Sequence, residues 1–231
     1  MSRLLIHVEG ETEETFVDEV LAPHLYSYGY SKISARLLGN ARMRAKRGGI
    51  KSWVSVRDEI LNHLKADAGC LSTMMVDYYA LPQKDPSNWP QREASNALSF
   101  EEKPRTIQAA IHADICVQMG LGFNVSRFIP YIMMHEFEGL LFSDPEKLAF
   151  GIGKASLRDN LEAIKASFST PEHINDSPLT APSKRILQLY PSYEKPLMGT
   201  LAVLEIGLVA IRRECPFFDA WITQLELGCV E

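Results

Sequence analysis

LLIHVEGETEETF, residues 4–16, joins a hydrophobic run of strand length to an acidic segment typical of a helix start. A continuous hydrophobic run of this length predicts a buried strand of a parallel sheet over Arg3–Val8. Gly10 allows a tight exit from that strand, and Thr12 is the predicted N-cap of the following helix. Glu9 therefore stands at a strand end, where open α/β sheets form their ligand-binding crevice.

The alternation of strand and helix continues along the chain. Further strands are predicted over residues 33–38, 71–76 and 127–134, and helices over residues 52–67 and 103–119. Pro130 lies within the last of these strands and predicts an edge position or a kink there. The pattern predicts the α/β class, with an open, mostly parallel sheet and flanking helices.

Two other parts of the chain have a different character. Residues 80–102 are polar and contain three prolines, which predicts a long loop or lid. Beyond residue 151, helices separated by proline-rich turns are predicted over residues 156–168, 183–190, 196–213 and 216–227. We therefore expect an α/β core over residues 1–150 and a helical C-terminal region over residues 151–231 that packs on the core.

Composition limits the classes of function. The 231 residues are 46% hydrophobic, enough for a sizeable core, and the net charge is -5. Binding of nucleic acid would therefore need a local basic patch or bridging cations. The four cysteines form no C-x-x-C pair, which argues against structural zinc and a disulfide scaffold. We expect a cytoplasmic protein, because no signal peptide and no membrane-spanning run is evident.

Acidic residues follow three of the predicted strands. They are Glu9 with Glu13 four residues later, Asp77, and the pair Glu136 and Glu138. The carboxyl ends of parallel strands lie along one edge, so these side chains are expected to meet. Crowded carboxylates need a compensating charge, and Mg²⁺ or Mn²⁺ prefers such oxygen ligands. Each acid alone also has an ordinary explanation, such as helix capping or an Asx turn.

The most basic stretch lies between the second strand and the second helix. Its cationic residues are Arg42, Arg44, Lys46, Arg47 and Lys51. Two interpretations are equally supported: a solvated loop, or a loop that contacts nucleic-acid phosphates. The chain contains neither G-x-x-x-x-G-K-[ST] nor G-x-G-x-x-G, which argues against the usual nucleotide-binding folds.

Three short segments in this order resemble the Toprim domain: VEGETE (residues 8–13), MVDYY (75–79) and HEFE (135–138). More narrowly, they resemble Toprim proteins of bacterial defence loci, among them OLD-family nucleases and an uncharacterised group that opens with V-E-G-x-T-E. The resemblance covers residues 3–145 as a fold. The later segments APSKRI (181–186) and CPFF (215–218) also resemble that group.

The resemblance implies roles for individual residues. Glu9 matches the Toprim glutamate, a general acid/base or metal ligand, and Glu13 matches a second acid of the OLD arrangement. Asp77 matches the first aspartate of a D-x-D metal motif, but Tyr79 occupies the second position.

Two further roles follow from the same resemblance. Glu136 or Glu138 could supply the missing metal ligand, and Glu138 better matches the F-E pair of related nucleases. The OLD arrangement also includes a catalytic lysine, for which Lys184 is the candidate; a surface lysine at a helix start is an equally good interpretation.

The resemblance therefore predicts a Mg²⁺- or Mn²⁺-dependent nuclease that acts on DNA or RNA, in a bacterial defence or mobile-element system. It also implies a partner ATPase of the ABC/AAA type. The alternative is a degenerate Toprim module that binds or regulates such an ATPase, and a third hypothesis is another metal-dependent phosphoryl-transfer enzyme. The sequence leaves open whether the chain forms a homo-oligomer.

Overall fold

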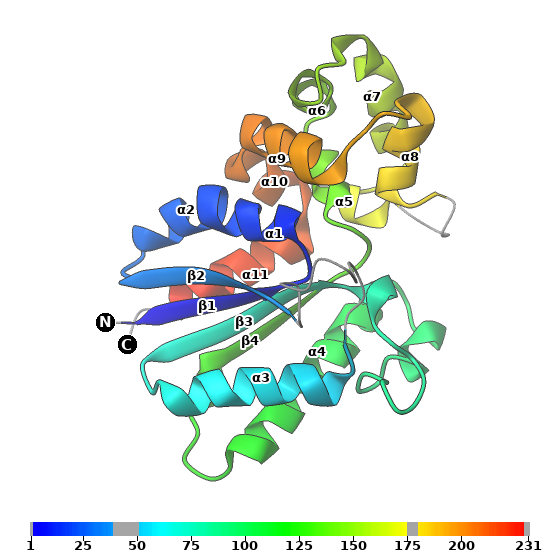
Figure 1. The fold of residues 1–231 in the computed structure, drawn as a ribbon. Coiled ribbons are helices and arrows are strands. Elements are labelled where there is room, and N and C mark those ends of the chain that lie inside the picture. Colours follow the sequence, from blue (N-terminus) through cyan, green and yellow to red (C-terminus); the bar gives the residue numbers. More distant parts are fainter. Residues whose placement is uncertain (1, 39–50, 175–179, 229–231) are drawn as a thin grey trace.

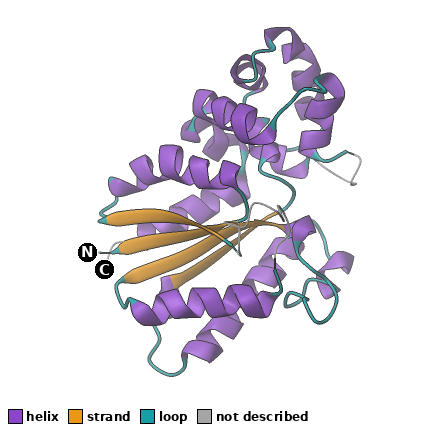
Figure 2. Ribbon diagram, in the orientation of Figure 1, coloured by secondary structure: helices purple, strands orange, loops and turns teal. Residues whose placement is uncertain are grey.

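The computed structural model describes residues 2–38, 51–174 and 180–228 and contains one parallel sheet (Figures 1 and 2). Its strand order is β2-β1-β3-β4. The strands are β1 (Arg3–Val8), β2 (Lys32–Leu37), β3 (Cys70–Asp77) and β4 (Phe128–Met133). The predicted α/β class with a parallel sheet is confirmed. Of the two possibilities for the strand that contains Pro130, an edge position or a kink, the structure shows the edge position.

Helices cover both faces of this sheet (Figure 1). One face carries α1 (Glu11–Phe16), α2 (Ala22–Tyr26) and α11 (Pro216–Leu227); the other carries α3 (Trp53–Ala66) and α4 (Glu102–Met119). Consecutive residues of β3 alternate between the two cores: Met75 packs into the first, Met74 and Val76 into the second. Because both faces are buried, the sequences of β1 and β4 are largely continuous hydrophobic runs.

The first helix begins earlier than predicted. Its N-cap is Gly10 rather than Thr12, which is buried in the first helical turn. The helix continues through a π-helical segment, Val17–Leu21, into α2. Pro23 lies just after that segment, where the wider turn accommodates a residue without an N–H group.

The segment after β3 is packed rather than lid-like. It contains 3₁₀ turns at Tyr78–Ala80 and Ala94–Ala97. Trp89 is buried and its Nε1 donates to the carbonyl of Lys51 at 3.0 Å. Arg92 is also buried: its Nε donates to the Tyr78 carbonyl at 2.9 Å and its guanidinium lies 3.8 Å from the Tyr78 ring centre. These contacts tie the segment to the second core.

The remaining helices form a layer above α1 that extends toward the carboxyl ends of the strands (Figure 1). They are α5 (Glu138–Leu141), α6 (Pro145–Gly151), α7 (Arg158–Ala166), α8 (Pro182–Leu189), α9 (Lys195–Ile206) and α10 (Leu208–Glu214). The prediction of a single helix over residues 196–213 is wrong. Gly207 adopts a φ of 77° and separates α9 from α10. Of the helices in the described ranges, none is long and apolar enough to cross a membrane.

One hydrophobic cluster joins the first and second halves of the chain. The Trp221 ring on α11 stacks on the Tyr131 ring of β4, with centres 4.7 Å apart, and its Nε1 donates to Thr73 at 2.9 Å. At Gly151, a Cβ atom would lie 2.5 Å from the Cα of Ala202, so α6 and α9 approach closely only because this residue is glycine. The domain boundary at residue 150 stays a prediction.

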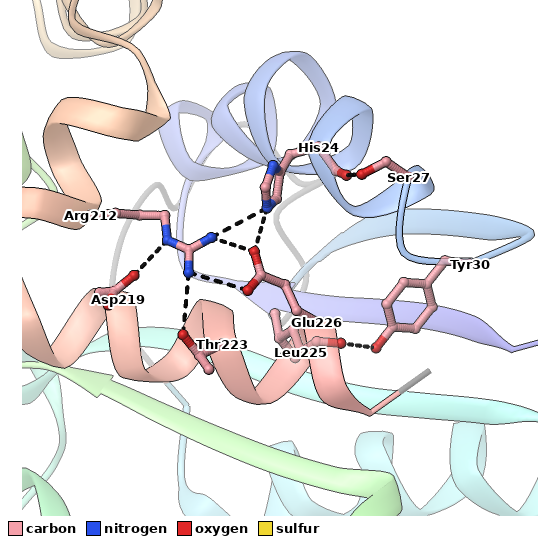
Figure 3. Close-up of polar contacts among 8 residues, drawn as sticks. All are labelled: His24, Ser27, Tyr30, Arg212, Asp219, Thr223, Leu225 and Glu226. Carbon is pink, nitrogen blue, oxygen red and sulfur yellow. Dashed lines mark hydrogen bonds and ion pairs between the residues drawn. The ribbon is translucent and has the colours of Figure 1, made fainter. Parts of the chain in front are cut away.

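Arg212 anchors the C-terminal helices to α2 (Figure 3). Its guanidinium pairs with both carboxylate oxygens of Glu226 and with Asp219 at 2.5 Å, and donates to Thr223 at 3.2 Å. His24 on α2 completes the cluster, with its Nε2 2.6 Å from Glu226 Oε1. One cation thus connects the consecutive helices α10 and α11 to α2, which is distant in sequence.

We predict that Arg212→Ala lowers the free energy of unfolding by about 2 kcal/mol, because the Glu226 side chain, only 10% exposed, loses its cation. Arg213→Ala is the matched control: this neighbour is 66% exposed, and its change should stay within about 0.5 kcal/mol. Urea unfolding followed by circular dichroism measures both. Equal midpoints for the two variants would contradict this role.

Candidate functional site

The sheet register places two acids side by side. Val8 pairs with Met75 in the β1–β3 register, so Glu9 leaves its strand next to the end of β3, where Asp77 lies. Asp77 in turn pairs with Met133 of β4, and Glu136 follows three residues later. The acids after three separate strands therefore reach the same edge of the sheet.

Asp77 is at the centre of this group. Burial raises its pKa well above the ordinary value, and the negative charges of Glu9, Glu13, Glu138 and Glu136 raise it further. Charge effects between carboxylates are strongest where the groups lie close together in a poorly hydrated environment. The structure thus brings together the five carboxylates named from the sequence.

Glu9 has an incompletely satisfied carboxylate. Its Oε2 atom is buried and has no hydrogen-bond partner in the part of the chain that the structure describes. Burial raises the pKa of Glu9, and the negative charge of Glu136 raises it further. The backbone N–H of Asp77 and the positive charge of Lys195 lower it. A buried acceptor without a partner is unfavourable. A bound cation or a proton donor would supply the missing partner of Glu9 Oε2.

Glu13 both borders the site and caps α1. It is the third residue of that helix, and its carboxylate accepts from the backbone N–H groups of Glu13 and Gly10, as in a capping box. A Cβ atom on residue 10 would lie 2.9 Å from Glu13 Oε2, so glycine leaves room for this carboxylate. Burial raises the pKa of Glu13, and the charge of Glu9 raises it further.

Glu136 and Glu138 share one cation, Lys195, at the start of α9. The Lys195 Nζ donates to Glu138 Oε2 at 3.1 Å and lies 3.5 Å from Glu136 Oε2. Burial lowers the pKa of Lys195, but Glu138 and Glu136 more than offset this, so that its pKa is raised. Burial also raises the pKa of the Glu138 carboxyl, and Lys195 opposes that rise.

The lysine that contacts these acids is Lys195, and the catalytic role of Lys184 stays a prediction. Lys184 is exposed on α8, with no ion pair to any carboxylate in the described ranges, whereas Lys195 contacts two of the five acids. Sequence reasoning missed Lys195 because a lysine before a proline at a helix start carries no signal of its own. Tyr193 was also missed: its buried hydroxyl has no partner among the described residues, and burial, Glu138 and Glu136 raise its pKa.

The two later segments that resemble the V-E-G-x-T-E group are helix N-termini capped by distant acids. Glu136 Oε2 accepts the Ser183 N–H of α8 at 3.1 Å. Glu172 accepts the N–H groups of Phe217 and Phe218 of α11 at 3.0 and 2.9 Å. Burial raises the pKa of Glu172 to about 7 despite these bonds. Both contacts match the helix-dipole preference for anions at N-termini.

Tyr79, at the second aspartate position of the D-x-D motif that the resemblance implies, points to the surface and is 51% exposed. Its ring stacks on the buried His135 ring, with centres 5.3 Å apart and planes 9° apart. Burial lowers the pKa of His135 to about 4, and His173 and Lys103 act in the same direction. His135 is therefore neutral at pH 7, directly before Glu136 in the chain.

The predicted phosphate-binding stretch falls mostly outside the described residues. Arg42, Arg44, Lys46 and Arg47 lie within residues 39–50, which the structure does not describe. Lys51 is exposed, and its carbonyl accepts the Trp89 indole N–H. The proposed contacts with phosphate stay a prediction.

The donor chemistry of the site fits Mg²⁺ or Mn²⁺, since the acids offer carboxylate oxygens and Glu9 Oε2 has no hydrogen-bond partner within the described ranges. However, among residues 2–38, 51–174 and 180–228, no three histidine, cysteine, aspartate or glutamate side chains are placed to hold a metal ion as they stand. Like charges repel, Lys195 holds Glu136 and Glu138, and Glu13 caps α1. Metal binding by the five carboxylates stays a prediction.

Two solved structures are similar to this chain in overall course. The match to the C-terminal region of the Burkholderia pseudomallei OLD protein covers 99% of this chain and 97% of the other chain, with 16% sequence identity and a TM-score of 0.45. The C-terminal region of the Xanthomonas campestris pv. campestris OLD protein covers 99% and 96%, with 12% identity and a TM-score of 0.42. No curated protein matches the chain. The family described as Domain of unknown function (DUF4276) matches residues 8–226, and the chain therefore belongs to that family.

Proposed function

We propose that this protein is a Mg²⁺- or Mn²⁺-dependent nuclease of Toprim type that hydrolyses phosphodiester bonds. The observation that carries the proposal is the gathering of five carboxylates around Asp77 at the carboxyl edge of a parallel sheet. Such a concentration of buried negative charge is unfavourable unless cations are bound, so it is typical of a metal-binding catalytic site. The order of the VEGETE, MVDYY and HEFE segments supports the Toprim type.

Divalent cations bound by Glu9, Asp77 and Glu138, with Glu13 and Glu136 beside them, would activate water and stabilise charge on the phosphate oxygens. Glu9 would accept a proton from the attacking water; burial, which raises its pKa, supports this role as a general base. Lys195 is 45% exposed, so its ammonium can exchange a carboxylate partner for a phosphate oxygen. The Tyr193 hydroxyl, which lacks a partner in the described ranges, could donate to the same phosphate.

The wider setting of the proposal follows from the motif resemblance alone. It comprises action on DNA or RNA, a role in a bacterial defence or mobile-element system, and a partner ATPase of the ABC/AAA type. A chain with a net charge of -5 needs a local basic patch to bind nucleic acid, and the basic residues between β2 and α3 would supply these phosphate contacts.

A degenerate module that binds or regulates an ATPase is the second candidate. Two observations favour it: Tyr79 stands where D-x-D has its second aspartate, and Lys195 already neutralises part of the charge of Glu136 and Glu138. The two candidates differ in one measurable property, the affinity for divalent cations.

We predict that the purified protein cleaves nucleic acid with Mn²⁺ or Mg²⁺ and that Glu9→Gln and Asp77→Asn each lower the rate at least about a hundred-fold, because each removes a carboxylate from the centre of the site. Gel analysis of labelled DNA and RNA measures the rate. Glu11→Gln is the matched control, since Glu11 is exposed in the first turn of α1. Cleavage that survives both Glu9→Gln and Asp77→Asn would rule out this mechanism.

The two lysines can be compared in the same assay. We predict that Lys195→Ala slows cleavage about ten-fold or more, because the ammonium next to Glu138 is lost, and that Lys184→Ala has a smaller effect. Circular dichroism on both variants checks that they fold. A larger loss for Lys184→Ala would return the catalytic role to the residue expected from the motif resemblance.

We predict that affinity for Mn²⁺ increases as pH rises from about 5 to 8 and that binding releases protons, since carboxylates with raised pKa values must deprotonate to bind a cation. Isothermal titration calorimetry in two buffers of different protonation enthalpy counts the protons released. Asp77→Asn should release fewer. Absence of binding at every pH would favour the ATPase-binding module.

A further inference from the structure

A connected group of aromatic rings lies beside the five carboxylates. It begins with Tyr79 stacked on His135, and Phe100 continues it, with its ring centre 5.8 Å from that of His135. Phe100 then stacks on His173, with centres 4.0 Å apart and planes 20° apart, and lies 5.9 Å from Phe217. We call these five residues the ring platform.

The ring platform is joined to the carboxylate site by very short stretches of chain. Tyr79 follows Asp77 by two residues, so their Cα atoms are at most about 7 Å apart. His135 directly precedes Glu136. The stacked pair of rings is thereby fixed to two of the five acids, within the reach of one nucleotide whose phosphate occupies the carboxylate site.

Tyr79 is the accessible end of the ring platform. It is 51% exposed, whereas His135 beneath it is buried. An exposed aromatic side chain supported from below by a second, parallel ring is a rigid surface, so little conformational entropy is lost when a planar ligand stacks on it.

Positively charged side chains border the ring platform. The Arg105 guanidinium lies 5.8 Å from the Phe217 ring centre, and Lys103 is close enough to lower the pKa of His135. Both residues belong to the first turns of α4, and Arg105 is exposed. Cations next to stacking rings complement a ligand that combines planar bases with phosphates.

We propose that the ring platform binds single-stranded nucleic acid, with an unpaired base stacked on Tyr79. The inference rests on the proposed function for the class of substrate and adds which form of it enters the site. In a duplex both faces of a base are covered by its neighbours, so only an unpaired base can present a face to Tyr79. The tyrosine that departs from D-x-D thereby acquires a role in substrate binding.

The test measures binding without cleavage. Short fluorescently labelled oligothymidylate and oligouridylate are titrated with the full chain at low salt with Ca²⁺, an oxygen-binding cation that replaces Mg²⁺ or Mn²⁺, and a gel of the same samples checks that the strands stay intact. Anisotropy gives the dissociation constants, and the two arms distinguish DNA from RNA. Tyr79→Ala should raise the dissociation constant for the bound strand about ten-fold or more, and Tyr79→Phe should bind like the unchanged protein. An unlabelled duplex of the same length should compete poorly.

Tyr26→Ala is the matched control. Tyr26 is 48% exposed on α2, away from the carboxyl ends of the strands, and its loss should not change binding. Urea unfolding verifies that both alanine variants fold. The proposal fails if neither oligonucleotide binds, if the duplex competes as well as the single strand, or if Tyr79→Ala binds like the unchanged protein.

Binding and cleavage are separable in this design. Single strands that bind through Tyr79 but are never cleaved with Mn²⁺ would support the ring platform and remove the nuclease proposal. Normal cleavage by the Tyr79→Ala variant would support the nuclease proposal and overturn the ring platform.

Discussion

The parallel pairing of β1 with β3 is the constraint on which the site depends. Parallel strands release their carboxyl ends at one edge, and the pairing of Val8 with Met75 brings Glu9 beside Asp77. β4 then adds Glu136 and Glu138 to the same edge. A shift of one residue in this register would move each side chain to the other face of the sheet and separate the acids. The hydrophobic residues that hold the register therefore also hold the site.

The concentration of acids has a thermodynamic cost. Asp77, Glu9, Glu13 and Glu138 all have raised pKa values in the folded chain, with burial as the largest cause. A carboxyl group whose pKa is raised by folding stabilises the fold below its ordinary pKa, and that stabilisation is lost as pH rises through the folded-state value. At neutral pH these acids therefore oppose folding until a cation offsets their charge.

The helical layer provides much of that compensation. Lys195 at the start of α9 pairs with Glu136 and Glu138, and the N-terminus of α8 donates Ser183 N–H to Glu136. Glu13 receives backbone N–H groups at the start of α1. Helix N-termini carry partial positive charge, so the packing of α8 and α9 over the strand ends both closes the fold and reduces repulsion in the site.

The sequence alone determined the sheet and the identity of the acids. The span of β1 was predicted as it is found, and so was α11, because hydrophobic periodicity and the turn residues that flank it are local signals. Pro130 predicted an edge position or a kink for β4, and the strand is found at an edge, where a missing N–H is tolerated. The gathering of the five acids could also be foreseen, because a parallel sheet leaves no other place for strand ends. Their roles as metal ligands stay predictions.

Only the tertiary structure decided the partners of those acids. Lys195 lies 57 residues from Glu138, and Glu172 caps a helix 45 residues away at Phe217, so neither contact has a local sequence signal. The break between α9 and α10 at Gly207, and the stacking of Tyr79 on His135, likewise depend on how distant segments pack. Periodicity fixes which face of an element is buried, whereas the choice of polar partner is made between elements and requires the assembled fold.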